Sequence, residues 1–151
     1  MPGPLTRILT AVAPDTVERV RRILAGHELL IVHNIDAAKA ILGKEDVGLI
    51  FIGARFDESR MFELLEFIRQ HIEHRKIPIV AGIIVPTTMS ENTIKGLGHA
   101  SKIYGASVFA NLNDFPDDDI GNQRVRLIVD ALIAPPEVIP KVQEILGGKA
   151  P

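Results

Sequence analysis

Two periods of apolar residues alternate along this chain. Five short runs rich in β-branched residues predict strands over residues 7–13, 28–33, 47–52, 77–85 and 107–112. Between and after these runs, apolar residues recur every three or four positions, which predicts helices over residues 17–24, 37–42, 61–68, 90–104 and 117–133. Each strand is therefore followed by one helix. Right-handed crossovers then make the strands parallel and place helices on both faces of the sheet.

The predicted fold is a single α/β domain over residues 1–134, a doubly wound (βα)5 flavodoxin-like sandwich with a five-stranded parallel sheet. The run 47–52 is continuously apolar, so this strand is expected to be buried on both faces. Gly26 is expected to stop the first helix. Asn34 or Asp36 can cap the second helix, which Gly43 is expected to end.

Two further segments carry local signals. Residues 53–59 are expected to form a loop, with Asp57 or Ser59 capping the helix that follows. After residue 134, two consecutive prolines start a C-terminal tail, residues 135–151, that ends the last helix. The tail has one apolar stripe, made of Val138, Val142, Ile145 and Leu146. That stripe can pack on its own domain, on a second protomer or on a partner.

Composition narrows the class of function. The chain has 151 residues, 46% of them hydrophobic, and no cysteine, which excludes disulfides, thiolate metal sites and cysteine nucleophiles. The formal net charge is -2, so no overall positive field attracts a nucleic acid. No apolar run approaches the roughly 18 residues that cross a bilayer, and the first residues lack the apolar core of a signal peptide. We expect a cytoplasmic protein with no nucleic-acid or membrane partner.

Four segments carry a resemblance to a known family. They read TRILTAVAPDTVERVRRIL, VGLIFIGARFDESRMFELLEFIR, KIPIVAG and GASVFANL. Over roughly residues 6–134, the chain resembles the CheY-like receiver domains of response regulators. The resemblance implies the strand order 2-1-3-4-5. It also implies a site where Mg²⁺ and an aspartate take up a phosphoryl group.

Every position that receivers use for phosphorylation has changed in this sequence. The acidic pair after the first strand falls on Val12 and Ala13, and the acceptor aspartate, counted back from ELLEFIR, falls on Gly53. The hydroxyl expected at the end of the fourth strand falls on Ile83, and the lysine after the fifth falls on Leu112. None of these residues offers an oxygen ligand for Mg²⁺ or a charge for a phosphoryl group. The resemblance therefore implies a degenerate pseudo-receiver.

Acidic residues elsewhere have two interpretations. Asp57 and Glu58 follow the third strand and can be a displaced acceptor or part of a solvated loop. Asp114 and the run of aspartates 117–119 follow the fifth strand, where carboxylates can bind a cation or cap a helix. Capping needs no further ligand, so the sequence assigns no metal.

Other polar residues give weaker signals. His71 and His74 have a spacing that suits two metal ligands on a helix, but their polar surroundings are also typical of a solvated helix end. Thr87 and Thr88 can contact a ligand or form a turn after Pro86. The sequence has no Walker loop, dinucleotide-binding fingerprint or Ser-His-Asp order, so it indicates no cofactor and no enzyme.

The resemblance also identifies a candidate interaction surface. Receivers form dimers and contact partners through the face made by the fourth helix, fifth strand and fifth helix, here 90–104, 107–112 and 117–133. The residues of that face are Lys95, His99, Lys102, Tyr104, Phe109, Arg124 and Arg126. The aromatic ring at the position of Phe109 changes rotamer in receivers, and without a phosphoryl signal we expect it to be fixed. The alternative for the charged residues is an ordinary solvated helix face.

These observations lead to one main hypothesis and two alternatives. We expect a non-phosphorylatable signalling module, an adaptor or regulator in a two-component-type pathway, that binds a protein partner. A homodimer through the candidate face or the tail is part of this hypothesis. The first alternative is a sensor that binds a small molecule or an anion in the altered pocket at the carboxyl edge of the sheet. The second, an enzyme of flavodoxin-like topology, lacks a converging nucleophile, metal set or cofactor loop.

Overall fold

A computed structural model describes residues 6–71 and 76–133 of the protein. In chain order, the strands are β1 (Arg7–Ala11), β2 (Glu28–Val32), β3 (Leu49–Gly53), β4 (Ile79–Ile83) and β5 (Val108–Asn111). The α-helices are α1 (Val17–Ile23), α2 (Ile35–Lys44), α3 (Phe56–Ser59), α4 (Met61–Gln70), α5 (Glu91–Ile103) and α6 (Asp119–Ile133). Two 3-10 turns are η1 (Pro14–Thr16) and η3 (Leu112–Asp114). The predicted tail and His74 lie outside the described residues.

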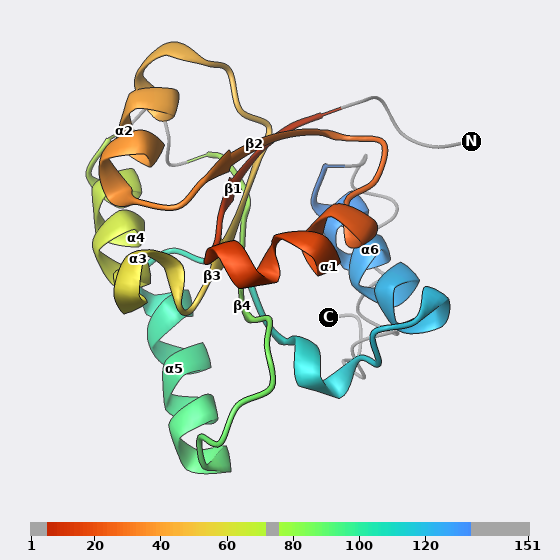
Figure 1. Ribbon diagram of the computed structural model, residues 1–151. Helices are drawn as coiled ribbons and strands as arrows, with labels where there is room; N and C mark the ends of the chain where they lie inside the picture. The colour runs from red at the N-terminus through yellow and green to blue at the C-terminus, as the bar shows by residue number, and fades with distance from the viewer. Residues whose placement is uncertain (1–5, 72–75, 134–151) are drawn as a thin grey trace, which may run out of the picture.

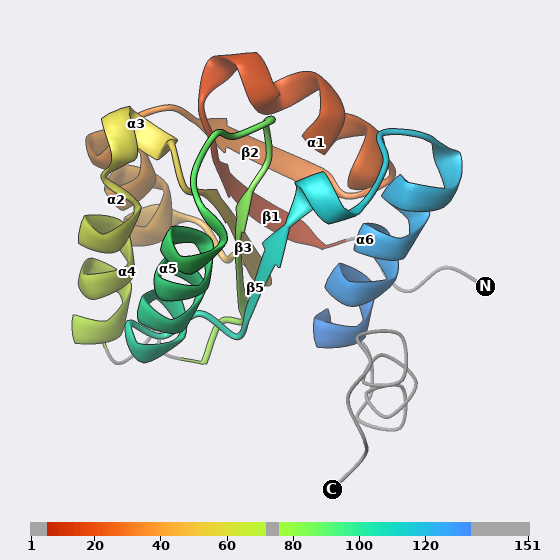
Figure 2. The same ribbon diagram turned by 90° about the horizontal axis from the view of Figure 1, so that it is seen from below.

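The five strands form one parallel sheet in the order β2-β1-β3-β4-β5. Helices α2, α4 and α5 lie on one face of this sheet, and α1 and α6 lie on the other (Figures 1 and 2). The predicted doubly wound α/β sandwich and its strand order are therefore confirmed. Every residue of β3 and β4 is buried, because helices cover these central strands on both sides.

The sheet divides the buried side chains into two clusters. Successive residues of a strand point to opposite faces, so neighbours such as Ile50 and Phe51 belong to different clusters. One cluster packs the sheet against α2 and α4, with Leu64 and Leu65 among its fully buried residues. The other packs it against α1 and α6, with Val129 at the centre of α6. Both clusters support the carboxyl ends of the strands.

Capping residues and a glycine account for several helix ends. The Asn34 side chain accepts a hydrogen bond of 2.8 Å from Ala37 N, which identifies Asn34 as the cap of α2. Ser90 caps α5 by accepting from Thr93 N at 3.2 Å. Gly26, after α1, has a φ of +95°, a left-handed conformation that glycine adopts without steric cost. Gly43 does not end α2, which continues to Lys44, because Gly43 does not adopt the left-handed conformation of a glycine stop.

Several predicted boundaries differ from the observed ones. The strands predicted over 7–13 and 77–85 end earlier, at Ala11 and Ile83, because parallel pairing stops there and the chain turns toward a proline. The segment predicted as a loop over 53–59 contains the short turn α3, in which Asp57 and Glu58 have left-handed backbone angles and not those of an α-helix. Phe56 is fully buried and anchors this turn. Among the described residues, no helix combines the length and apolar character needed to cross a membrane.

Candidate functional site at the carboxyl edge of the sheet

The sheet brings the five signature positions to one edge. Val12 follows β1, Gly53 ends β3 and Ile83 ends β4. Ala13 and Leu112 complete the group, and all five residues are buried. Because the carboxyl ends of parallel strands meet at the same edge, residues far apart in sequence become neighbours here. The edge is apolar where a phosphorylation site would need carboxylates, a hydroxyl and a lysine.

Ile84 fills the space in front of Gly53, and sequence reasoning missed it. A Cβ atom added at Gly53 would lie 3.1 Å from Ile84 Cδ1 and 3.7 Å from Val12 Cγ1. The contact with Ile84 Cδ1 is closer than an ordinary van der Waals contact between carbon atoms, so a longer side chain at position 53 would have to displace Ile84. We call Val12, Gly53 and Ile84 the apolar plug. The apolar run that continues past Ile83 was the available sequence signal.

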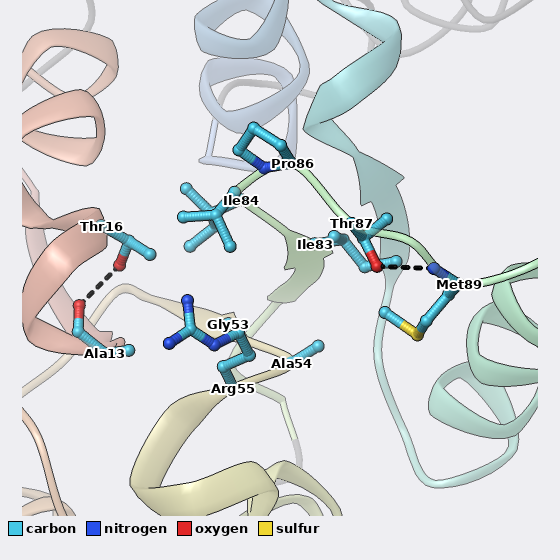
Figure 3. Close-up of a pocket in the computed structure, with 11 residues that line it drawn as sticks. Ala13, Thr16, Gly53, Ala54, Arg55, Ile83, Ile84, Pro86, Thr87 and Met89 are labelled. Atoms are coloured by element: carbon cyan, nitrogen blue, oxygen red, sulfur yellow. Dashed lines mark hydrogen bonds between the residues drawn. The ribbon is translucent and has the colours of Figure 1, made fainter.

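A small cavity remains beside the apolar plug (Figure 3). Its volume is about 50 Å³, which is space for one or two water molecules. The other residues that line it include Ala13, Thr16, Arg55, Thr87 and Met89. The cavity is too small for most metabolites, whose pockets generally have several hundred Å³.

Polar groups at the rim of this cavity are bonded to neighbouring loops. Arg55 Nη1 donates to Asp15 Oδ2 at 2.9 Å. The Thr16 hydroxyl donates to the carbonyl of Ala13 at 2.7 Å, and the Thr87 hydroxyl oxygen accepts from Met89 N at 3.1 Å. The turn interpretation of Thr87 agrees with this last bond. These side chains fix the loops at the edge of the sheet.

Asp57 is turned toward α2 and does not face the plug. Its Oδ2 accepts hydrogen bonds from Ile35 N at 2.9 Å and from Arg60 Nη1 at 3.1 Å. The carboxylate therefore supports the start of α2. The prediction that Asp57 or Ser59 caps the following helix is wrong, since α4 has no side-chain cap. Asp57, Glu58 and Ser59 all have positive φ angles, 46°, 55° and 69°, which re-aim the chain before α4.

Arg19 of α1 holds the turn that follows β5. Its side chain is only 13% exposed. Nε donates to Asn122 Oδ1 at 3.0 Å, Nη1 donates to the Leu112 carbonyl at 3.2 Å, and Nη2 donates to the Phe115 carbonyl. We call Arg19, Asn122 and Asp117 the Arg19 clamp, because Asn122 Nδ2 also donates to Asp117 Oδ1 at 2.9 Å. Nothing in the sequence pattern of α1 distinguished Arg19 from its neighbouring arginines.

Electrostatics within the clamp favour charged side chains. The hydrogen bond from Asn122 and the nearby Arg22 lower the pKa of the Asp117 carboxyl below its ordinary value. Arg22 Nη2 lies 2.7 Å from Asp117 Oδ2. Burial lowers the pKa of Arg19, although it remains a cation at neutral pH. The clamp is thus an ion-paired and hydrogen-bonded region next to an apolar one.

The clamp is connected to the loop after β4. The Asn113 side chain donates to the Val85 carbonyl at 3.1 Å, joining the turn after β5 to the loop that leads into α5. Asp118 Oδ1 accepts from Gly121 N at 2.8 Å, which supports the capping interpretation for this aspartate. Within residues 6–71 and 76–133, no group of three His, Asp or Glu side chains is arranged to hold a metal ion.

Four of the seven residues of the predicted interaction surface lie together. Lys95, His99, Lys102 and Phe109 line one groove between α5 and β5, with a volume of about 420 Å³. Helix α5 lies directly on the Phe109 ring, since a Cβ at Gly98 would be 2.8 Å from Phe109 Cδ2. The groove has an apolar floor and two lysines in its lining, and Asp114 also lines it.

Two predicted members of this surface contact side chains or backbone of other helices. The Tyr104 ring packs on Phe62 of α4, with ring centroids 5.2 Å apart. Arg126 faces α1, where Nη1 donates to the Ala25 carbonyl and Nε donates to Asp130 Oδ1 at 2.9 Å. The inclusion of Arg126 in the interaction surface stays a prediction, and in the structure its guanidinium is bonded to the end of α1 and to Asp130. Arg124 is exposed on α6.

His71 ends α4. Its Nδ1–H donates to the Phe67 carbonyl at 2.7 Å, and its ring stacks near the Phe67 ring. This hydrogen bond occupies one ring nitrogen with the helix's own backbone. His74, the second histidine of the predicted pair, lies outside the described residues.

Comparisons with known proteins give matches among solved structures but not among family models or curated sequences. No known family model matches the chain, and no curated protein sequence matches it. Solved structures do match. NtrX from Brucella abortus is 20% identical with a TM-score of 0.66, covering 94% of this chain and 30% of NtrX. The chain therefore spans less than a third of that protein.

Separate receiver domains match over nearly their whole length. The receiver domain of NtrX from Brucella abortus is 24% identical, with a TM-score of 0.63, over 83% of this chain and 97% of that domain. The N-terminal signal receiver domain of a two-component response regulator from Bacteroides fragilis is 15% identical, with a TM-score of 0.66, over 87% and 99%. The chain has the fold of response-regulator receiver domains.

Proposed function

We propose that this chain is a receiver-fold signalling module that takes up no phosphoryl group and acts by binding another protein. The observation that carries the proposal is the position of Ile84 Cδ1, 3.1 Å from where a side chain at position 53 would begin. The space directly in front of position 53 is occupied by the end of an apolar side chain. Val12 and Ala13, at the positions of the acidic pair, supply no oxygen ligand from their side chains for Mg²⁺.

The loops at this edge support a module without a phosphorylation switch. In this proposal, the Arg19 clamp and the Asn113 bond to Val85 hold the turn after β5 and the loop before α5 in one arrangement. Hydrogen bonds from a buried guanidinium are expensive to break, because each freed carbonyl is left without a partner. The module is then expected to present one constant surface to its partner, without enzymatic activity of its own.

The groove between α5 and β5 is the proposed partner surface. Lys95, His99 and Lys102 form no hydrogen bond or ion pair through their side chains with another described residue, so the two lysine charges and the His99 ring are available. Phe109 and Ile94 add an apolar floor. An acidic segment that carries an apolar side chain fits this combination, because charge steers the encounter and apolar burial supplies affinity.

The sensor alternative finds less support in the geometry. The cavity at the altered site has room for one or two water molecules only. A larger hollow of about 400 Å³ beside it is lined by Arg19 and Arg22, but Asp117 pairs with both. Neither space offers an unpaired cation for an anion, so protein binding is the function that we propose.

Loss of phosphoryl uptake is tested with a phosphoryl mimic. Amide NMR spectra of the protein would be recorded with and without Mg²⁺ and beryllofluoride. We expect no saturable shift at Gly53, Thr87 or Phe109, since Gly53 offers no acceptor group and Val12 and Ala13 offer no side-chain ligand for Mg²⁺. The variant Gly53→Asp should likewise remain unlabelled by a small-molecule phosphodonor. Saturable shifts in the wild-type protein would overturn this part of the proposal.

Partner binding is tested by charge reversal on the groove. Proteins captured from a lysate of the source cells by the wild-type chain would be compared with those captured by Lys95→Glu/Lys102→Glu. The matched control is Arg21→Glu/Lys44→Glu, two exposed cations on α1 and α2. We expect the control to retain the wild-type partners and the groove variant to lose them. Equal capture by both variants would contradict the groove as the binding surface.

A further inference from the structure

One edge of β2 has no strand beside it among the described residues, because β2 ends the sheet order β2-β1-β3-β4-β5. Glu28 N donates to the Thr6 carbonyl at 3.0 Å, so Glu28 turns its backbone groups toward β1. These groups alternate in direction along a strand, which turns those of Leu29 and Ile31 away from β1. Within residues 6–71 and 76–133, these outward groups have no hydrogen-bond partner. Strand β2 therefore presents an open edge of two amides and two carbonyls.

The side chains of β2 suit a strand pair as well. Leu29, Leu30 and Ile31 are partly exposed, and the last two belong to neither core cluster. Natural edge strands are commonly protected against pairing by a lysine, a proline or a bulge. Strand β2 has none of these, since it reads ELLIV and pairs with β1 residue by residue. Its single charged residue, Glu28, lies 2.9 Å from Arg7 Nε and is neutralised by it.

We propose that β2 pairs antiparallel with β2 of a second copy, about a two-fold axis that passes between the two Leu30 residues. In this register, Leu29 lies opposite Ile31 of the second copy, and by symmetry Ile31 lies opposite its Leu29. Both members of each pair turn their backbone groups outward, so the two pairs exchange four hydrogen bonds. Every outward group of these residues is then satisfied, and the two copies share one continuous sheet.

Side chains and charge agree with this register. Leu30 meets Leu30 on the face of the sheet that α2 covers, and Leu29 meets Ile31 on the face that α1 covers. All three kinds of side chain are aliphatic, so each pair removes apolar surface from water. The two Glu28 carboxylates lie at opposite ends of the paired strands. They are about 14 Å apart, at about 3.4 Å per residue, which is too far for strong repulsion in salt.

A second copy is a better occupant of this edge than a flexible peptide. Strand β2 is already ordered by its pairing with β1, so two copies lose little backbone entropy when they meet. A flexible peptide pays that entropy for every residue that it orders. The pairing leaves the groove between α5 and β5 free, because β5 lies at the other end of the sheet. The inference does not depend on the proposed function.

The absence of cysteine from this chain allows a defined test. In full-length Leu30→Cys, the proposed pairing places two thiols opposite each other with Cα atoms about 4.5 Å apart, within the range of a disulfide. The matched control is Leu127→Cys on α6, a leucine that is 44% exposed and more accessible to chance collisions. Under mild oxidation, we expect disulfide-linked dimers of Leu30→Cys to form several-fold faster than those of the control, as measured on non-reducing gels.

Each other outcome overturns the inference. Equal or slower dimer formation by Leu30→Cys would show that the two β2 edges do not meet. Dimers formed faster by Leu127→Cys would identify α6 as the contact between copies. The variant Leu29→Cys tests the register, because two residues at position 29 would lie about 8 Å apart, beyond the roughly 7 Å that a disulfide spans. Dimers of Leu29→Cys that form as fast as those of Leu30→Cys would contradict the proposed register.

A second measurement avoids engineered thiols. Sedimentation equilibrium would be recorded over a range of concentrations for the wild-type chain, Ile31→Lys and Leu127→Lys. Lysine at position 31 adds the protection that natural edge strands have, without removing a hydrogen bond to β1. We expect the wild-type chain and Leu127→Lys to dimerise as concentration rises, and Ile31→Lys to remain monomeric with an unchanged circular dichroism spectrum. A wild-type chain that is monomeric at every concentration, or an Ile31→Lys variant that dimerises equally well, would contradict the pairing.

Discussion

Two neighbouring regions at the carboxyl edge of the sheet are held by different forces. The apolar plug closes the ends of β1, β3 and β4 with hydrocarbon contacts, including the close approach of Ile84 to Gly53. The Arg19 clamp closes the turn after β5 with hydrogen bonds and ion pairs. The same edge of one sheet is therefore stabilised by packing in one place and by polar bonds in another.

Because the two regions are held by different forces, different substitutions should destabilise them. Packing depends on the size and shape of side chains and hardly on pH. A guanidinium clamp depends on donors, acceptors and charge, and it costs more to break than its net contribution suggests. Substitutions that add volume should damage the plug, and those that remove donors or protonate carboxylates should damage the clamp.

The largest expected effect lies beside the clamp, at Gly121. A Cβ atom at this position would overlap the carbonyl oxygen of Pro116, and backbone cannot move aside as a flexible side chain can. We expect Gly121→Ala to lower the free energy of unfolding by about 3 kcal/mol, the upper end of overpacking costs. Urea unfolding followed by circular dichroism measures it.

The matched control for Gly121→Ala is Gly96→Ala in α5. Gly96 has no atom within 4 Å of the added Cβ and a helical backbone. Alanine there should raise stability by up to about 1 kcal/mol, because it favours the helix. A Gly121→Ala protein as stable as the wild type would show that the turn after β5 is not tightly fixed.

A somewhat smaller effect is expected from removing the guanidinium of the clamp. Arg19→Met keeps most of the apolar stem but leaves Asn122 and two backbone carbonyls without their donor. We expect a loss of about 2 kcal/mol in the free energy of unfolding. Arg21→Met, which removes an exposed arginine from the same helix, should change stability by less than about 0.5 kcal/mol. Equal effects of the two substitutions would mean that the clamp contributes no stability.

The plug is best tested by a double-mutant cycle. Gly53→Asp introduces a carboxylate against Ile84 and Val12, and Ile84→Ala removes the side chain that the carboxylate would displace. We expect the double variant to be more stable than the sum of the two single losses predicts, by about 1 kcal/mol. The free energies of unfolding of the four proteins provide the coupling. Additive losses would show that Ile84 does not fill the space in front of position 53.

The sequence was sufficient for the fold but not for the details of the edge. Alternating strand and helix patterns predicted five parallel strands, and the buried runs of β3 and β4 have the composition of central strands. Strand ends were predicted less well, since 7–13 continues apolar to Ala13 while pairing stops at Ala11. An apolar run indicates burial, and burial continues into loops that pack on the core.

Side-chain partners at the site could not be predicted from spacing. Arg19, Arg21 and Arg22 look equivalent in the sequence. Yet of these three only Arg19 donates to two backbone carbonyls of the turn after β5, whereas Arg22 pairs with the Asp117 side chain. Asp57 was assigned to its own helix but supports α2, 22 residues earlier in the chain. Such contacts depend on the three-dimensional arrangement of loops, which local pattern does not contain. The resemblance to receivers identified the positions at the edge but not the residue, Ile84, that fills it.

The smallest expected effect is a pH dependence confined to the clamp. The Asn122 hydrogen bond and Arg22 lower the folded-state pKa of Asp117 below that of an unfolded aspartate, about 3.9. A lowered carboxyl pKa contributes stability that is fully present above the unfolded value and is lost as pH falls through the folded value. Asp117 is 44% exposed, so solvent and salt keep this contribution small. The Asn122 side-chain amide signals should therefore shift below about pH 4 in wild-type NMR spectra and not in Asp117→Asn, whereas a transition confined to higher pH would contradict the assignment to Asp117.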